Sequence, residues 1–100
     1  MALTGEPIDA ERAAELGLVN RVCEPGEALA TALALAEEIS ANGPLALIAS
    51  KAILEQQWDW SQQEMWERQQ EITEPVFSSE DAIEGSKAFA DKRAPVWKGK

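Results

Sequence analysis

The sequence has no histidine and a single cysteine among its 100 residues. Without histidine, Ser-His-Asp and Cys-His catalytic arrangements are impossible, and a zinc site would have to be built from carboxylates. Cys23 has neither a second cysteine to bond nor a histidine to act as its base, so we interpret it as a small buried apolar residue. Asp and Glu are plentiful, and acid–base chemistry by carboxylates is the catalytic option that remains.

A glycine-rich phosphate loop is also missing, since the six glycines are scattered singly. The sequence contains no run of about 18 apolar residues and no pattern of a secretory signal, so we expect a soluble, cytosolic protein. A formal charge of −9 argues against nucleic acid or an anionic membrane as a partner. The hydrophobic fraction of 45% is ordinary for a globular protein, and the length fits one domain.

The first quarter of the chain predicts one short helix followed by one short strand. Asp9 is a good N-cap for a helix over residues 10–16, and Gly17 can adopt the left-handed conformation that ends it. Residues 18–23 alternate around two valines, which predicts a strand. Pro25-Gly26 then breaks the chain.

Two strongly apolar helices are predicted next, over residues 27–41 and 44–57. Asn42-Gly43 stops the first, and Pro44 suits the first turn of the second, where no N–H is needed. Apolar residues wrap most of the circumference of the second helix, so it must be buried on several sides. Because so short a chain offers few elements to cover it, we expect the remaining apolar surface to meet another subunit or a missing domain.

Two further helices are predicted in the second half. Ser61 and Glu64 form a capping box for a helix that Pro75 ends, and Ser79 caps a last helix that runs to about Arg93. The residues expected to be buried on this last helix are Ala82, Ile83, Ser86, Phe89 and Ala90. The chain is therefore predicted to be mostly α, with four to five helices and one short strand.

Four glutamates of the helix after Ser61 share one face. They are Glu64, Glu67, Glu71 and Glu74. Such carboxylates could carry out acid–base chemistry or bind a hard cation, or they could simply be a solvated face. Arg68 lies four residues after Glu64, a helix-stabilising spacing, and no apolar pocket residues interleave the acids on their face, so we favour the solvated face.

Gly85 and the four tryptophans each allow a structural and a ligand-binding interpretation. Gly85 lies inside the last predicted helix, which indicates close approach by another helix or by a ligand, and we favour packing. Trp58, Trp60, Trp66 and Trp97 could stack on a base or line an acyl pocket, or they could hold a corner between helices or an interface. We favour the corner or interface.

The charge of the chain is divided unevenly along its length. Five cations against one carboxylate give residues 87–100 a charge of +4, which leaves −13 for residues 1–86. The cations are Lys87, Lys92, Arg93, Lys98 and Lys100. This end could be a solvated, mobile tail, could complement the C-terminus of the last helix, or could receive an anionic ligand such as a phosphorylated cofactor. From the charges alone we favour the first two interpretations over the ligand.

Three landmarks in the sequence, in order and spanning essentially the whole chain, resemble the crotonase (enoyl-CoA hydratase/isomerase) family. The first is Leu3-Thr4-Gly5-Glu6-Pro7-Ile8-Asp9-Ala10 followed by Ala14-x-x-Gly17-Leu18-Val19-Asn20-Arg21-Val22. The second is Asn42-Gly43-Pro44 with Ser50-Lys51, and the third is Ser79-Glu80-Asp81-x-x-Glu84-Gly85-x-x-Ala88-Phe89-x-x-Lys92-Arg93-x-Pro95. The chain looks most like the hydratase branch, although isomerase, dehydratase and ring-processing relatives share these landmarks.

The resemblance implies that the chain is the C-terminal segment of such an enzyme. In the family, the oxyanion hole and the two catalytic glutamates of hydratases belong to an N-terminal α/β spiral domain, which is absent from these residues. We therefore assign no catalytic and no metal-binding residue, and we expect the chain to be inactive alone. Residues 1–25 would be the end of the spiral domain, and residues 26–100 a helical segment that mediates oligomerisation and covers CoA.

The resemblance also implies a ligand contact. Phe89 and Lys92 match positions of the closing helix that contact the adenine and phosphate end of CoA in hydratases. The alternatives are a core aromatic and a surface lysine. The expected partners are a CoA thioester, bound as the substrate of a full-length homo-oligomeric enzyme with no other cofactor. A free-standing helical interaction module without activity, or a regulatory fragment that assembles with full-length subunits, are the alternatives for the whole chain.

Overall fold

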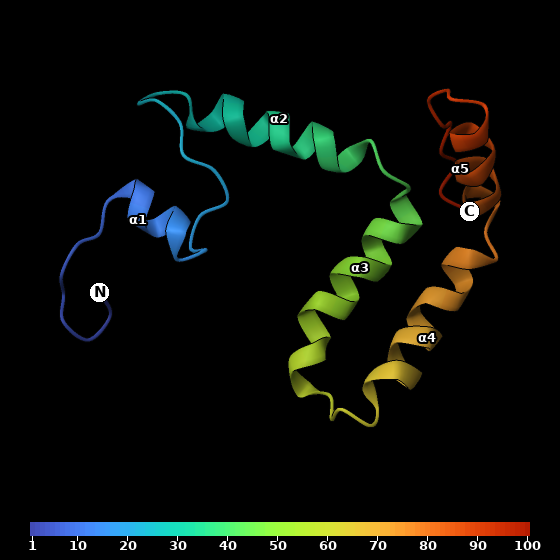
Figure 1. The fold of residues 1–100 in the computed structure, drawn as a ribbon, viewed down its shortest axis with the longest axis horizontal. Coiled ribbons are helices and arrows are strands. Elements are labelled where there is room, and N and C mark those ends of the chain that lie inside the picture. The colour runs from blue at the N-terminus through green and yellow to red at the C-terminus, as the bar shows by residue number, and fades with distance from the viewer. The chain divides into compact units, whose positions relative to one another are not determined.

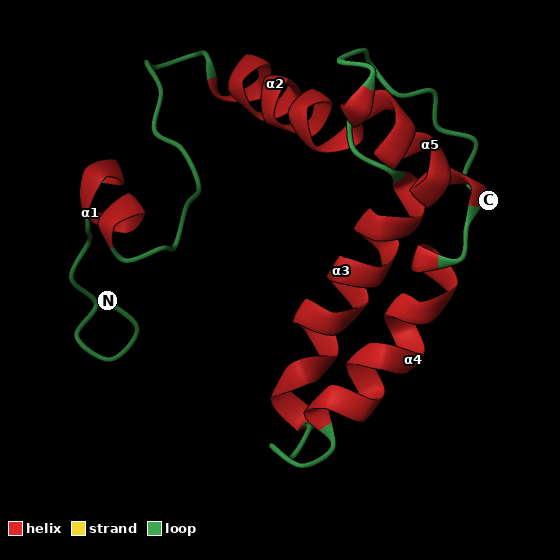
Figure 2. Cartoon of the chain, turned by 45° about the vertical axis from the view of Figure 1, so that its right-hand side comes forward, coloured by secondary structure: helices red, strands yellow, loops and turns green.

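Helices account for all the regular structure, as Figures 1 and 2 show. The computed structural model describes all 100 residues. Its helices are α1 (Ala10–Glu15), α2 (Ala28–Ser40), α3 (Pro44–Gln56), the 3₁₀ turn η1 (Gln57–Asp59), α4 (Met65–Phe77) and α5 (Glu80–Ala90). The predicted mostly helical fold, with four to five α-helices, is confirmed.

The predicted strand over residues 18–23 is wrong. After α1 the backbone turns, bends as far as Asn20, and has no regular structure from there to Glu24. A strand needs a neighbouring strand to satisfy its backbone N–H and C=O groups. The 100 residues contain no strand that could pair with this segment, so the alternation around the two valines produces none.

Both ends of α1 follow the sequence. Asp9 accepts a hydrogen bond from the backbone N–H of Arg12 at 2.8 Å. At the other end Gly17 has a φ of +72°, and the N–H of Leu18 donates to the carbonyl of Ala13 at 2.8 Å. This is the pattern of a helix closed by a left-handed residue, which confirms the predicted N-cap and terminating glycine.

The chain divides into two compact units, residues 1–37 and residues 38–100, with the boundary inside α2. In the first unit Cys23 is half-buried, not fully buried as predicted. The second unit contains α3, α4 and α5. The assignment of residues 1–25 to the end of a spiral domain stays a prediction.

Helices α2 and α3 leave most of their apolar side chains uncovered. α2 buries no residue, and α3 buries only Ala49. The exposed large apolar residues on the two helices are Leu29, Leu33, Ile39, Ile48 and Leu54. The prediction that these helices carry more apolar surface than the chain can cover is confirmed. Neither helix alone is long and apolar enough to cross a membrane. Only α2 and Pro44–Asp59 together reach the necessary length and apolar character, as a pair bent by 110°.

In the second unit α3 and α4 lie side by side and run in opposite directions (Figures 1 and 2). A shallow apolar groove follows their contact. It is lined by Leu45, Ile48, Ala49, Ala52, Ile72, Pro75 and Val76. Ile72 and Val76 are four residues apart on α4 and therefore share one face of that helix, which packs on α3.

The turn into α4 is held by the predicted capping box. The backbone N–H of Ser61 donates to Oε2 of Glu64 at 3.1 Å, and the N–H of Glu64 donates to Oγ of Ser61 at 3.3 Å. Glu64 also accepts from the Ser61 hydroxyl at 2.6 Å and from Arg68 at 2.9 Å. The bond from Ser61, followed by that from Arg68, lowers the pKa of Glu64 to about 2. The Arg68 guanidinium lies 6.0 Å from the centre of the Trp60 ring, which places Trp60 at this corner.

Helix α4 does not end at Pro75, as the sequence predicts, but continues to Phe77. Pro75 has no N–H to bond the carbonyl of Glu71 and its ring crowds that carbonyl, so it weakens the last turn of α4 without ending the helix at once. Just beyond the helix, the backbone N–H and the hydroxyl of Ser78 donate to the carbonyl of Glu74 at 3.2 and 3.0 Å. These bonds satisfy the helix end that the proline would otherwise weaken.

Helix α5 begins at the predicted cap and ends earlier than predicted. The Ser79 hydroxyl oxygen accepts from the N–H of Ala82 at 3.0 Å. The helix stops at Ala90, three residues before Arg93.

The side of α5 that is buried also differs from the prediction. Asp81 and Ala88 are buried, whereas Ile83 and Phe89 are 70% and 88% exposed. The apolar residues predicted the opposite face as the buried one. The sequence pattern of α5 could not show that the residues after the helix pack against it.

Candidate functional site

The chain leaves α5 through an unusual turn at Lys92. This is the only residue other than glycine with a positive φ, at +52°. The N–H of Lys92 donates to the carbonyl of Phe89 at 3.3 Å, and the N–H of Arg93 donates to that of Ala88 at 3.0 Å. This is the Schellman pattern, in which glycine usually occupies the left-handed position. A side chain in that position costs about 1–2 kcal/mol in steric strain, so Lys92 is held there against its own preference.

Both residues predicted to contact CoA are exposed at this end of α5. Phe89 is 88% exposed, and Lys92 is exposed on the turn that follows. The Lys92 ammonium forms no ion pair, in contrast to Arg93 and Lys98. An exposed aromatic ring close in sequence to an unpaired ammonium suits a ligand that combines a planar base with phosphate. The alternative that Phe89 is a core aromatic residue is therefore wrong for the structure of these 100 residues.

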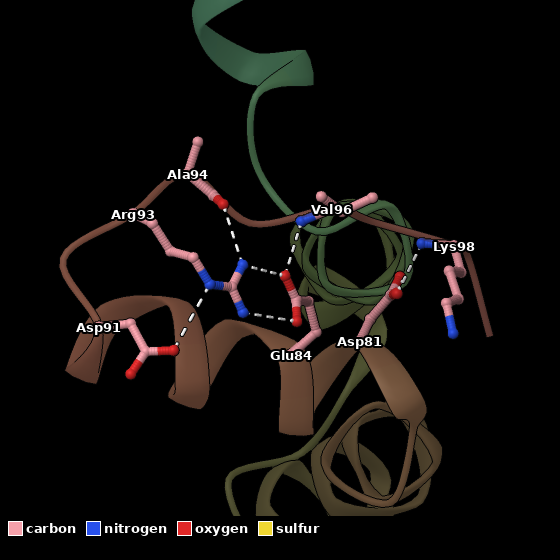
Figure 3. A network of polar contacts seen from close by, with 7 residues as sticks. All are labelled: Asp81, Glu84, Asp91, Arg93, Ala94, Val96 and Lys98. Carbon is pink, nitrogen blue, oxygen red and sulfur yellow. Dashed lines mark hydrogen bonds and ion pairs between the residues drawn. The ribbon is translucent and has the colours of Figure 1, made fainter.

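Arg93 is folded back onto α5, as Figure 3 shows. Its Nη1 and Nη2 donate to Oε1 and Oε2 of Glu84 at 2.7 and 3.0 Å, and its Nε lies 3.5 Å from Asp91. Oε1 of Glu84 also accepts from the N–H of Val96 at 2.8 Å, in the segment 94–100 that we call the tail. The bond from Arg93, followed by that from Val96, lowers the pKa of Glu84 to about 2.

Asp81 fixes the far end of the tail. Its two carboxylate oxygens accept from the backbone N–H groups of Lys98 and Gly99 at 2.7 and 2.8 Å, and its own N–H donates to the carbonyl of Lys100 at 3.1 Å. The Lys98 ammonium pairs with Glu80 at 3.1 Å. Carboxylates of α5 therefore bind the backbone of the tail, although most of its residues are exposed; its mobility stays a prediction.

Trp97 holds the middle of the tail. Its Nε1 donates to the carbonyl of Ala41 at 2.8 Å, and its ring lies over two glycines. A Cβ atom added to Gly85 would be 3.1 Å from the ring, and one added to Gly43 would be 3.7 Å from it. The predicted packing at Gly85 is confirmed, but the neighbour is Trp97 of the tail rather than another helix.

Trp58, Trp66 and the glutamates of α4 lie on the surface. Trp58 and Trp66 are 85% and 75% exposed, so an interface role for them stays a prediction. Glu67, Glu71 and Glu74 are exposed, in agreement with a solvated face. No group of three or more His, Cys, Asp or Glu side chains is placed to hold a metal ion.

A shallow groove of about 480 Å³ lies along α5 and the tail. It is lined by Glu80, Asp81, Ile83, Glu84, Lys87, Arg93, Val96 and Lys98. Charges of both signs are balanced there, since three carboxylates face three cations. Phe89 and Lys92 do not line this groove, so their candidate contact is an open surface at the end of the helix.

The carboxylates of α5 that bind the tail could not be found from the sequence. Glu84 and Arg93 are nine residues apart, and Asp81 and Lys98 are seventeen apart. These spacings exceed the three or four residues at which side chains meet on one helix. The only signal was the count of acids on α5 and of cations after it.

Comparison with known proteins agrees with the landmarks of the sequence. The profile of the family described as Enoyl-CoA hydratase/isomerase matches residues 1–100. The chain belongs to the enoyl-CoA hydratase/isomerase family. It is 44% identical over 95 residues to Enoyl-CoA hydratase EchA19 of Mycobacterium tuberculosis, covering 95% of this chain and 36% of that protein. It is 39% identical over 104 residues to Carnitinyl-CoA dehydratase of Salmonella typhi, covering 100% of this chain and 40% of that protein.

Solved structures of this family contain the same fold. The crystal structure of an enoyl-CoA hydratase from M. tuberculosis H37Rv superposes on 99% of this chain with a TM-score of 0.95 and 55% identity. The superposition covers 39% of that hydratase chain. The 100 residues therefore span about two fifths of the family members that they match.

Proposed function

We propose that these residues form the C-terminal assembly and CoA-covering segment of an enoyl-CoA hydratase-like enzyme. The full-length enzyme would add water across the double bond of a 2-enoyl-CoA thioester, in fatty-acid metabolism. The catalytic groups would lie in the part of the enzyme outside these 100 residues, and we assign none of the glutamates described above to catalysis.

The observation that carries the proposal is the placement of Lys92. Its unpaired, exposed ammonium sits on a left-handed turn directly after the helix that carries the exposed ring of Phe89. An ammonium binds phosphate as a compact point charge, and an aromatic face stacks on a nucleobase. CoA carries both a phosphate and a nucleobase at its nucleotide end, far from the reacting thioester.

The test is Lys92→Ala in an enzyme that carries residues 1–100 as its C-terminal segment. This enzyme can be the full-length protein or a chimera in which the 100 residues replace the matching segment of a related hydratase. Contact with the nucleotide end is made equally in the ground and transition states, so KM for crotonyl-CoA should rise while kcat changes little. A partly exposed lysine–phosphate contact of about 1 kcal/mol or slightly more implies a rise of about five- to tenfold, smaller at high salt.

Lys98→Ala is the matched control. Lys98 has the same charge and lies on the same end of the chain, but its ammonium is already paired with Glu80. It should change KM much less than Lys92→Ala does. An unchanged KM for Lys92→Ala at low salt, in a protein that is folded and assembled, would make Lys92 a surface lysine and defeat the proposed CoA contact.

Assembly into a homo-oligomer is the second part of the proposal. It is supported by the uncovered apolar side chains of α2 and α3, which are too numerous for a stable solvent-exposed surface. Closed symmetric assembly is the usual way to bury such faces. The same observation favours the alternative function of a free-standing interaction module, which differs in that Lys92 would then have no ligand.

A further inference from the structure

Arg93 is attached to α5 through both its backbone and its side chain. Its N–H closes the turn onto the carbonyl of Ala88 at 3.0 Å, while its guanidinium forms the two-pronged pair with Glu84. The same guanidinium donates to the carbonyl of Ala94 at 3.1 Å. The residue after Lys92 is therefore fixed, and with it the peptide plane on one side of the strained turn.

A lysine gains by leaving the left-handed region, so its conformation persists only where the surroundings enforce it. On the helical side of Lys92, the last turn of α5 supplies that constraint. On the other side, Arg93 is attached by its own N–H and by the Glu84–Arg93 pair, and a bidentate pair fixes both distance and orientation. The exposed ammonium is thus presented by a turn that Glu84 holds from nine residues away.

The pair has a second effect, which concerns the choice of cation. Glu84 and Asp91 occupy the guanidinium of Arg93, which lies beside Lys92 in the sequence. An arginine left free at this position would compete with Lys92 for any phosphate, with a different reach and a planar geometry. With Arg93 occupied, Lys92 is the available cation of the two.

We infer that Glu84 is a positioning residue for Lys92, holding Arg93 so that the left-handed turn presents the Lys92 ammonium to the phosphates of CoA. The inference rests on the proposed function and deepens it. Glu84 does not touch the ligand, and its effect passes through Arg93 and the backbone of Lys92.

The test compares two substrates in an enzyme carrying residues 1–100 as its C-terminal segment. Crotonyl-CoA has the nucleotide end, and crotonyl-pantetheine lacks it. Glu84→Gln should raise KM for crotonyl-CoA by about threefold and leave kcat unchanged. On a logarithmic scale this is about half of the rise expected for Lys92→Ala. KM for crotonyl-pantetheine should not change. General loss of structure would affect both substrates.

The sign of the change separates positioning from simple electrostatics. Removing a carboxylate and releasing a guanidinium near an anionic ligand would by themselves lower KM for crotonyl-CoA. A lowered or unchanged KM in Glu84→Gln therefore overturns the inference. Glu80→Gln is the matched control, since it removes one carboxylate from the same helix but leaves the turn at Lys92 intact.

Two further variants make the result decisive. Arg93→Lys keeps the charge but cannot form the bidentate pair, so it should raise KM for crotonyl-CoA as Glu84→Gln does, and it serves as the test if Glu84→Gln does not fold. In a Lys92→Ala background, Glu84→Gln should cause no additional rise, whereas an additive rise contradicts coupling through Lys92. If Lys92→Ala raises KM and Glu84→Gln does not, only this inference fails. If Lys92→Ala itself has no effect, the proposed CoA contact fails and this inference with it.

Discussion

Replacing Lys92 by glycine should stabilise the protein and weaken substrate binding at once. The left-handed φ of +52° costs a lysine about 1–2 kcal/mol that glycine avoids. Glycine also gives the unfolded chain more freedom, which returns about 0.5–1 kcal/mol of that gain. The net stabilisation should be about 0.5–1 kcal/mol, or about 2 °C in Tm for an enzyme of family size.

Lys92→Ala is the matched comparison. Alanine removes the ammonium as glycine does, but its Cβ keeps the strain of the left-handed turn. Both variants should therefore raise KM for crotonyl-CoA to the same extent, about five- to tenfold, while only the glycine variant melts at a higher temperature than the parent.

Thermal unfolding followed by circular dichroism gives the stability difference, and initial-rate kinetics at low salt give KM. A glycine variant no more stable than the alanine variant would refute the claim that Lys92 is strained. A glycine variant with the parental KM would refute the claim that its ammonium binds substrate.

The other predictions concern the chain alone and its response to acid. The isolated 100 residues should sediment as dimers or trimers; Ile48→Glu should shift them to smaller or unfolded species, Glu67→Gln should not, and a well-folded monomer at high concentration would contradict the expectation. They should not hydrate crotonyl-CoA above background, and turnover abolished by substituting one of their own glutamates would overturn the reading of this chain as a non-catalytic segment. Arg93, with smaller contributions from the Val96 N–H and Lys87, lowers the pKa of Glu84 in the folded protein. The ionised Glu84 should therefore contribute to the free energy of unfolding above the ordinary pKa of 4.5, and this contribution should be lost as the pH falls through about 2. The carboxyl ¹³C resonance of Glu84 should titrate with that low midpoint, and a midpoint near 4.5 would show that the pair does not form in solution.

Features encoded within a few residues could be predicted from the sequence. The cap at Asp9, the terminating Gly17 and the reciprocal bonds of Ser61 with Glu64 all lie where local chemistry placed them. Each depends on groups no more than about four residues apart, which the sequence displays directly.

Features that depend on distant partners could not be predicted in this way. The strand over residues 18–23 failed because strands form only with a neighbour, and a local alternation cannot provide one. The predicted end of α5 was too late because a left-handed residue that ends a helix is usually recognised as a glycine. Here Lys92 occupies the left-handed position. The attachment of the tail could not be predicted, because nothing near Lys98 in the sequence shows that Asp81 binds its backbone.

The fit between Trp97 and Gly85 has a consequence for how this segment can vary among related proteins. A Cβ at residue 85 would lie 3.1 Å from the indole, closer than a well-packed contact allows. A side chain at residue 85 therefore requires the ring at residue 97 to shift by a few tenths of an ångström or to be replaced by a smaller residue. The residues at these two positions, twelve apart in the sequence, should therefore covary in size among related proteins.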